Sequence, residues 1–132
     1  MWGKRTKVRK NDILFSRYIR ELANWQCAAC GKDYSDNHQG LHCSHYFSRR
    51  KENTRFDLDN SIALCIYHHN LWGHGDGRAE YTEFMIKKLG SEGFDLLRLR
   101  ADLYFKRDDF LTALVLKEML NELENEKDSI RD

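Results

Sequence analysis

The chain has 132 residues, 22 of them Lys or Arg and 21 Asp or Glu, so its net charge is +1. This balance excludes a uniformly basic nucleic-acid coat protein and an acidic tail protein, and 41% hydrophobic residues exclude a disordered chain. A mean hydropathy of −0.75 without a long apolar run predicts no membrane span. The basic start lacks an apolar segment behind it, so we expect no secretory signal and a cytoplasmic protein.

The N-terminal segment is basic, because residues 1–20 carry seven basic groups and one acid. We expect residues 1–10 to form a flexible basic arm, which can serve either as a DNA-binding surface or as a solvated tail. Asn11 or Asp12 can cap a helix that runs to about Asn24. Its apolar stripe comprises Leu14, Phe15, Tyr18, Ile19 and Leu22.

All Cys and His residues lie between Cys27 and His74, which indicates a site in the middle of the chain. Cys27 and Cys30 form a C-x-x-C pair, and Cys65 and His68 form a C-x-x-H pair after 34 intervening residues. A Cys₃His set leaves no open ligand position, so we expect a structural zinc. We take His68 as the fourth ligand, with the adjacent His69 as the alternative.

Two other roles for these thiols are less favoured by the sequence. A redox C-x-x-C is expected next to a βαβ pattern, which is missing around Cys27. Disulfides are rare in cytosolic proteins. Cys43 is left over, and we interpret it as a small buried apolar residue.

The segment between the two ligand pairs predicts a strand, a loop and a helix. Gly40–Phe47 is the expected strand, and a helix that begins near Cys65 carries His69. One zinc fixes both ends of this unit, and a His on the strand then faces ligands on the helix. Such an arrangement suits hydrolysis, because a divalent cation polarises a phosphate while a neutral His deprotonates water.

The C-terminal flank predicts helices, because apolar residues recur there at helical spacing. Gly90 ends the first helix, and Asp108 or Asp109 begins the last. The three stripes are Tyr81, Phe84, Met85 and Leu89; Phe94, Leu97, Ala101 and Tyr104; and Phe110, Ala113, Leu116, Leu120 and Leu123.

The order C-x-x-C-G, His, Asn, C-x-x-H-His resembles the HNH, or ββα-metal, nuclease motif. Longer segments are similar to the phage lambda NinG (Rap) family of recombination endonucleases and follow its order over roughly residues 12–90. These segments are Asp12–Arg20, Ser44–Arg49, Arg55–Asn60, the Cys65 pair, Glu80-Tyr81 and Ile86–Gly90.

The resemblance implies an α+β fold with a ββα-metal core and a structural zinc knuckle over residues 11–90. An N-terminal helix and two or three C-terminal helices flank this core, and residues 91–132 form a helical extension. The implied activity is metal-dependent hydrolysis of phosphodiester bonds in branched DNA, such as Holliday junctions and D-loops, by a phage or prophage protein in a bacterial host. Phage or host recombination proteins are implied partners. By analogy, a homodimer could form through the stripe of Asp109–Glu124.

The resemblance also implies the roles of individual residues. His45 is the general base, and Asn60 holds the loop and orients that His. His42 and His69 are ligands of a catalytic Mg²⁺ or Mn²⁺. Arg49, Arg50, Lys51 and Arg55 either grip phosphates or form a solvated loop.

Three features depart from the family pattern. His42 stands where relatives often carry Asp, His68-His69 replaces a Cys-Asn ending, and His74–Gly77 is inserted. Softer imidazole ligands shift the metal preference from Mg²⁺ towards Mn²⁺ or other transition metals. Two alternatives stay open: an HNH nicking or restriction-type endonuclease on duplex DNA, and a non-catalytic zinc-stabilised DNA-binding module.

Overall fold

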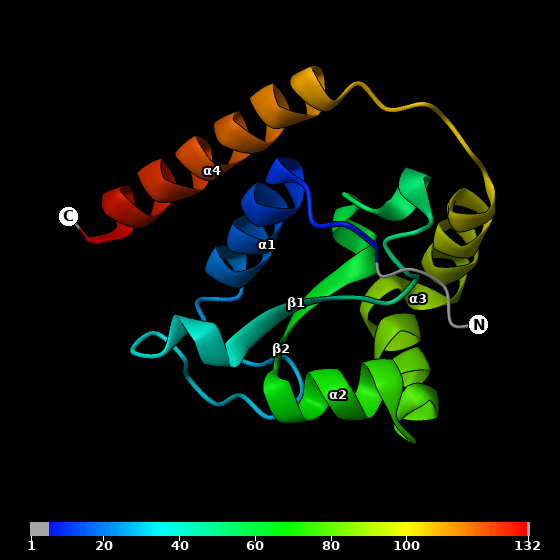
Figure 1. The fold of residues 1–132 in the computed structure, drawn as a ribbon. Coiled ribbons are helices and arrows are strands. Elements are labelled where there is room, and N and C mark those ends of the chain that lie inside the picture. Colours follow the sequence, from blue (N-terminus) through cyan, green and yellow to red (C-terminus); the bar gives the residue numbers. More distant parts are fainter. Residues whose placement is uncertain (1–5, 132) are drawn as a thin grey trace.

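The computed structural model describes residues 6–131 and confirms the expected α+β class (Figure 1). No helix in this part of the chain is both long and apolar enough to cross a membrane. The helices are α1 (Lys10–Leu22), α2 (Ile66–His74), α3 (Arg78–Asp102) and α4 (Asp109–Arg131), and the strands β1 (Leu41–His45) and β2 (Ser61–Cys65) form one antiparallel sheet.

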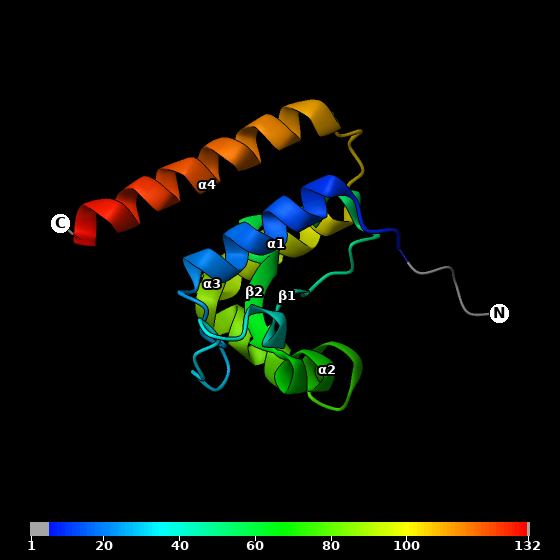
Figure 2. The ribbon, with the colours of Figure 1, turned by 60° about the vertical axis from the view of Figure 1, so that its left-hand side comes forward.

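The sheet lies between helices on both of its faces. Alternate side chains of β1 point in opposite directions, and their contacts identify the two faces. Ser44 Oγ and Tyr81 Oη of α3 are 2.9 Å apart, whereas the ring of His45 packs against Phe15 of α1 with centroids 5.8 Å apart. α4 lies on the side of α1 that faces away from the sheet, as two views show (Figures 1 and 2).

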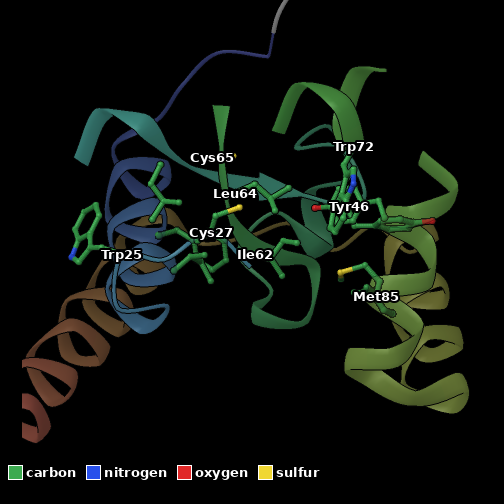
Figure 3. Close-up of a cluster of buried hydrophobic side chains, with 14 of the residues drawn as sticks. Trp25, Cys27, Tyr46, Ile62, Leu64, Cys65, Trp72 and Met85 are labelled. Atoms are coloured by element: carbon green, nitrogen blue, oxygen red, sulfur yellow. The ribbon is translucent and has the colours of Figure 1, made fainter. Parts of the chain in front are cut away.

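The hydrophobic core extends through the sheet and binds its layers together. All five residues of β2 are buried, so this strand runs through the interior of the protein. In Figure 3, Trp25 lies at one end of the cluster, and Trp72 and Met85 lie at the other. The cluster includes Phe15, Ile19, Leu41, Ile62, Leu64, Tyr81, Met85 and Leu97.

The start of α1 differs from the prediction. The N-cap is Arg9, not Asn11 or Asp12, and the side chain of Asp12 accepts a hydrogen bond from Arg9 N at 2.7 Å. Asp12 stands one turn inside the helix because its carboxylate also pairs with the buried Arg55. The stripe is buried at Phe15, but Leu22 remains 49% exposed.

The chain leaves α1 through two residues in the left-handed region, Asn24 with φ of 52° and Trp25 with φ of 60°. Asn tolerates this conformation, whereas a bulky residue is strained in it. The ring of Trp25 is stacked on His38 at 3.5 Å, with the guanidinium of Arg20 on it at 4.8 Å. These contacts hold the turn that leads into the first cysteine pair.

α3 bends at Gly90, whose φ of 79° breaks the helical path as the sequence predicts. The second half of α3 nevertheless belongs to the same core, because Phe94 packs on Tyr46 with ring centroids 5.5 Å apart. Arg100 also donates to Asp57 at 2.8 Å. α3 therefore bends at residue 90, and both of its halves belong to one folded unit.

α4 packs along α1 through its apolar stripe. Leu116 and Leu120 are only 3% and 6% exposed, and Glu124 pairs with Arg17 of α1 at 2.7 Å. This part of the stripe, which the sequence analysis offered as a dimer surface, is thus covered within the same chain. Phe110, in contrast, is 72% exposed.

Candidate metal centre and histidine cleft

Four predicted ligands converge between the α1–β1 segment and the start of α2. The ligand atoms of Cys27, Cys30, Cys65 and His68 all lie within 4.8 Å of one another. Two thiolates bound to one tetrahedral zinc at about 2.3 Å are about 3.8 Å apart. The residues therefore fit a structural metal ion such as zinc, and we call them the Cys₃His cluster.

Backbone hydrogen bonds around the Cys₃His cluster bring its two ligand pairs close together. Gly31 has φ of 74°, and its N–H donates to Cys27 O at 2.8 Å. Ala28 N donates to Ala63 O at 2.8 Å, which ties the first pair to β2. Cys65 ends β2 and caps α2, so the sheet and the helix together set the position of the second pair.

The structure settles which histidine belongs to the Cys₃His cluster. His68 Nδ1 is 3.2 Å from Cys65 Sγ, whereas the ring of His69 is stacked on His42, with centroids 5.3 Å apart. Burial raises the pKa of Cys27, but backbone N–H donors outweigh it and lower this pKa overall, which favours a metal-binding thiolate. Burial raises the pKa of Cys43 to about 12, so this thiol stays protonated.

Four of the other histidines line a cleft with a volume of about 1190 Å³. Its walls come from α1, β1, α2 and the first residue of α3, together with residues 6, 8 and 39 and the start of the loop between β1 and β2. We call it the histidine cleft, after His42, His45, His69 and His74. The three site histidines predicted from the sequence thus share one surface.

His42 and His69 each carry a buried ring nitrogen, His42 Nε2 and His69 Nδ1, that has no hydrogen-bond partner among the described residues. Their rings are nearly parallel, at 8°. Burial lowers the pKa of His69 to about 4, with smaller contributions from the neighbouring histidines. Burial and the charge of Arg20 lower the pKa of His42. Both imidazoles are therefore neutral near pH 7, the form that binds metals.

His45 is oriented by the backbone of the loop between β1 and β2. Its Nε2 lies 2.9 Å from Arg55 O. A carbonyl only accepts, so Nε2 carries the proton and Nδ1 is the basic nitrogen. Burial lowers the pKa of His45 to about 4, although the bond to Arg55 opposes this shift.

Asn60 is fully buried and connects both ends of the same loop. Its Oδ1 accepts from Phe47 N at 2.9 Å, and its Nδ2 donates to Phe47 O at 3.0 Å and Thr54 O at 3.1 Å. Thr54 directly precedes Arg55, the residue that holds His45. Asn60 thus ties together the backbone of the loop whose Arg55 carbonyl contacts His45, and it stays outside the cleft lining.

The four basic residues predicted to contact DNA have different surroundings. Arg49 lines the histidine cleft, Arg50 is exposed, and Lys51 lies 3.5 Å from Asp102. Arg55 is only 4% exposed, and its guanidinium is bound to Asp12. Because its donors face protein groups, we do not include Arg55 among the candidate phosphate contacts.

Sequence reasoning missed Arg20 and Arg78, which also line the histidine cleft. Arg20 lies in a helix and Arg78 begins another, and neither belongs to a Cys or His motif. Only the tertiary fold brings them to the cleft.

Comparisons with protein-family models, curated proteins and solved structures found no match to this chain. The resemblance to the NinG family therefore stays a prediction.

Proposed function

We propose that this protein is a metal-dependent HNH-type endonuclease that hydrolyses phosphodiester bonds in branched DNA. The observation that carries the proposal is the placement of His45, whose Nε2 is held by a backbone carbonyl in a cleft that also contains His42 and His69. The preference for branched DNA rests on the sequence resemblance to the NinG family.

His45 suits the role of general base. With Nε2–H bound to Arg55 O, Nδ1 takes a proton from a water molecule while the water oxygen bonds to phosphorus. The P–O bond to the leaving oxygen then breaks, and this oxygen keeps the bonding electron pair and takes a proton from solvent. A pKa of about 4 keeps His45 unprotonated at neutral pH, so the base is ready to accept the proton.

His42 and His69 suit the role of ligands for a catalytic metal. Their buried, unpartnered nitrogens are atoms that a bound cation would satisfy. When bound, a divalent cation supplies charge stabilisation to the phosphate and the leaving oxygen. Two imidazoles favour Mn²⁺ or another transition metal over Mg²⁺.

A four-way-junction cleavage assay with a series of Mg²⁺, Mn²⁺ and other divalent metals tests the proposal. We expect metal-dependent nicking by the zinc-loaded protein and its loss in His45→Ala, with zinc content unchanged. The control is Asn121→Ala, because Asn121 is exposed on α4 and does not line the cleft.

Three results would contradict parts of the proposal. Equal cutting of linear duplex would refute the branched substrate, and sequence-dependent cutting would indicate a restriction-type enzyme. No cleavage with any metal, together with tight and salt-dependent junction binding, would identify a non-catalytic DNA-binding module.

A further inference from the structure

Three arginines from separate segments line the histidine cleft: Arg20 of α1, Arg49 of the loop after β1 and Arg78 of α3. Asp12 is the sole acidic residue of the described cleft lining, and its carboxylate is bound to Arg55. The lining therefore carries an excess of positive charge next to the histidines.

Arg20 and Arg78 are held by neutral groups. Arg78 Nη2 donates to Tyr46 O at 2.8 Å, and its guanidinium lies 3.8 Å from the centre of the Tyr46 ring. Arg20 donates to Ser16 O at 3.2 Å and His38 O at 3.3 Å, and it lies over Trp25. Carbonyls and aromatic faces thus fix both side chains without neutralising their charge.

Several other arginines of the described chain differ in this respect. Arg17, Arg98 and Arg100 each form an ion pair with a carboxylate at 2.7 to 3.0 Å. Among the side chains that the structure describes, no carboxylate forms such a pair with Arg20 or Arg78. Fixed, unpaired guanidinium groups in a cleft favour an anionic ligand, because little side-chain entropy remains to be lost on binding.

The two arginines also lie at opposite ends of β1. Arg20 is bound to the carbonyl of His38, which precedes the strand, and Arg78 to that of Tyr46, which follows it. The five residues of β1 span about 17 Å. The rise per nucleotide of one DNA strand is only about 3.4 Å along the helix axis, so groups at the two ends of β1 reach different phosphates.

We propose that Arg20 and Arg78 bind two different phosphates of one DNA strand, so that the strand runs along β1 past His42 and His45. This inference rests on the proposed function, because it assigns DNA as the ligand of the same cleft. Arg20 and Arg78 thus take the place of Arg55 as phosphate contacts, and Arg49 stays a candidate contact beside them.

Fluorescence anisotropy with a labelled four-way junction, in buffer without added divalent metal or chelator, tests the inference. We expect Arg20→Gln and Arg78→Gln each to weaken binding about tenfold, as for a lost charged hydrogen bond. Each should also make the negative slope of log binding constant against log salt concentration shallower by about 0.9. Arg98→Gln removes the same charge from an exposed pair with Asp95 and should change neither quantity.

Folding is checked by zinc content and melting temperature, and Arg20→Lys and Arg78→Lys keep the charge at each position. We expect both Lys variants to retain the wild-type salt slope. The inference would be overturned if both Gln variants kept the wild-type affinity and salt slope. It would also be overturned if Arg98→Gln weakened junction binding as much as Arg20→Gln and Arg78→Gln do.

This test separates the inference from the endonuclease proposal. A wild-type protein that binds the junction through these arginines but cleaves nothing would support the inference and refute the enzyme. A wild-type protein that cleaves, while the Gln variants bind normally, would refute the inference and leave the enzyme in place.

Discussion

Asn60→Ala is expected to destabilise the protein strongly, because one buried side chain makes three hydrogen bonds to the backbone of the loop between β1 and β2. The bonds are to Phe47 N, Phe47 O and Thr54 O, at 2.9 to 3.1 Å. Each bond contributes about 1 kcal/mol net, and the unpartnered backbone groups add to the cost. We expect the free energy of unfolding to fall by about 3–4 kcal/mol.

Urea unfolding of the zinc-loaded protein measures this loss. Asn53→Ala is the matched control in the same loop, because Asn53 Nδ2 makes one partly buried hydrogen bond, to Arg100 O at 2.9 Å. We expect the control to lose about 1 kcal/mol. A loss below about 1 kcal/mol for Asn60→Ala would refute the assignment of the loop geometry to Asn60.

Three further predictions concern other parts of the molecule. Cys30→Ser should lose the zinc and lower the melting temperature by about 10 °C, which corresponds to a loss of about 3 kcal/mol in a domain of this size. Cys43→Ala should keep the metal, and elemental analysis measures the zinc content of both variants. Burial holds the pKa of His45 at about 4, below about 6.5 in the unfolded chain. The unfolded state then binds more protons between these values, so stability falls as the pH drops from about 6.5 to 4, and His45→Gln should weaken this fall in urea midpoints at about pH 7 and about pH 5. Leu116→Ala should cost about 2–3 kcal/mol and the 56%-exposed Leu111→Ala below about 0.5 kcal/mol in the same unfolding assay.

Features that depend on local sequence were predictable. The apolar spacing predicted the helical segment, and Gly90 was predicted to end a helix at the point where α3 bends. The two short pairs that contain Cys27 and Cys65 predicted the Cys₃His cluster, because the ligand spacing is set by the turn and by the helix start themselves. The strand at Gly40–Phe47 was expected, and β1 occupies its centre.

Features that depend on tertiary contacts were not predictable. The basic neighbours of Arg55 in the sequence predict an exposed side chain. Arg55 is nevertheless buried, because Asp12, 43 residues away, accepts its hydrogen bonds. For the same reason Asp12 is not the N-cap of α1. The stripe of α4 resembled an intermolecular surface, since an amphipathic pattern does not state which partner covers it.

The turn after α1 limits how this sequence can vary over evolutionary time. The φ of 60° at Trp25 favours Gly, whereas the stack with His38 and Arg20 requires a large planar ring. Gly would relieve the backbone and leave a cavity, and any other aromatic residue would keep the strain. No single substitution meets both demands, so we expect related sequences to retain an aromatic residue at position 25, preceded by Asn or Gly at the position of Asn24.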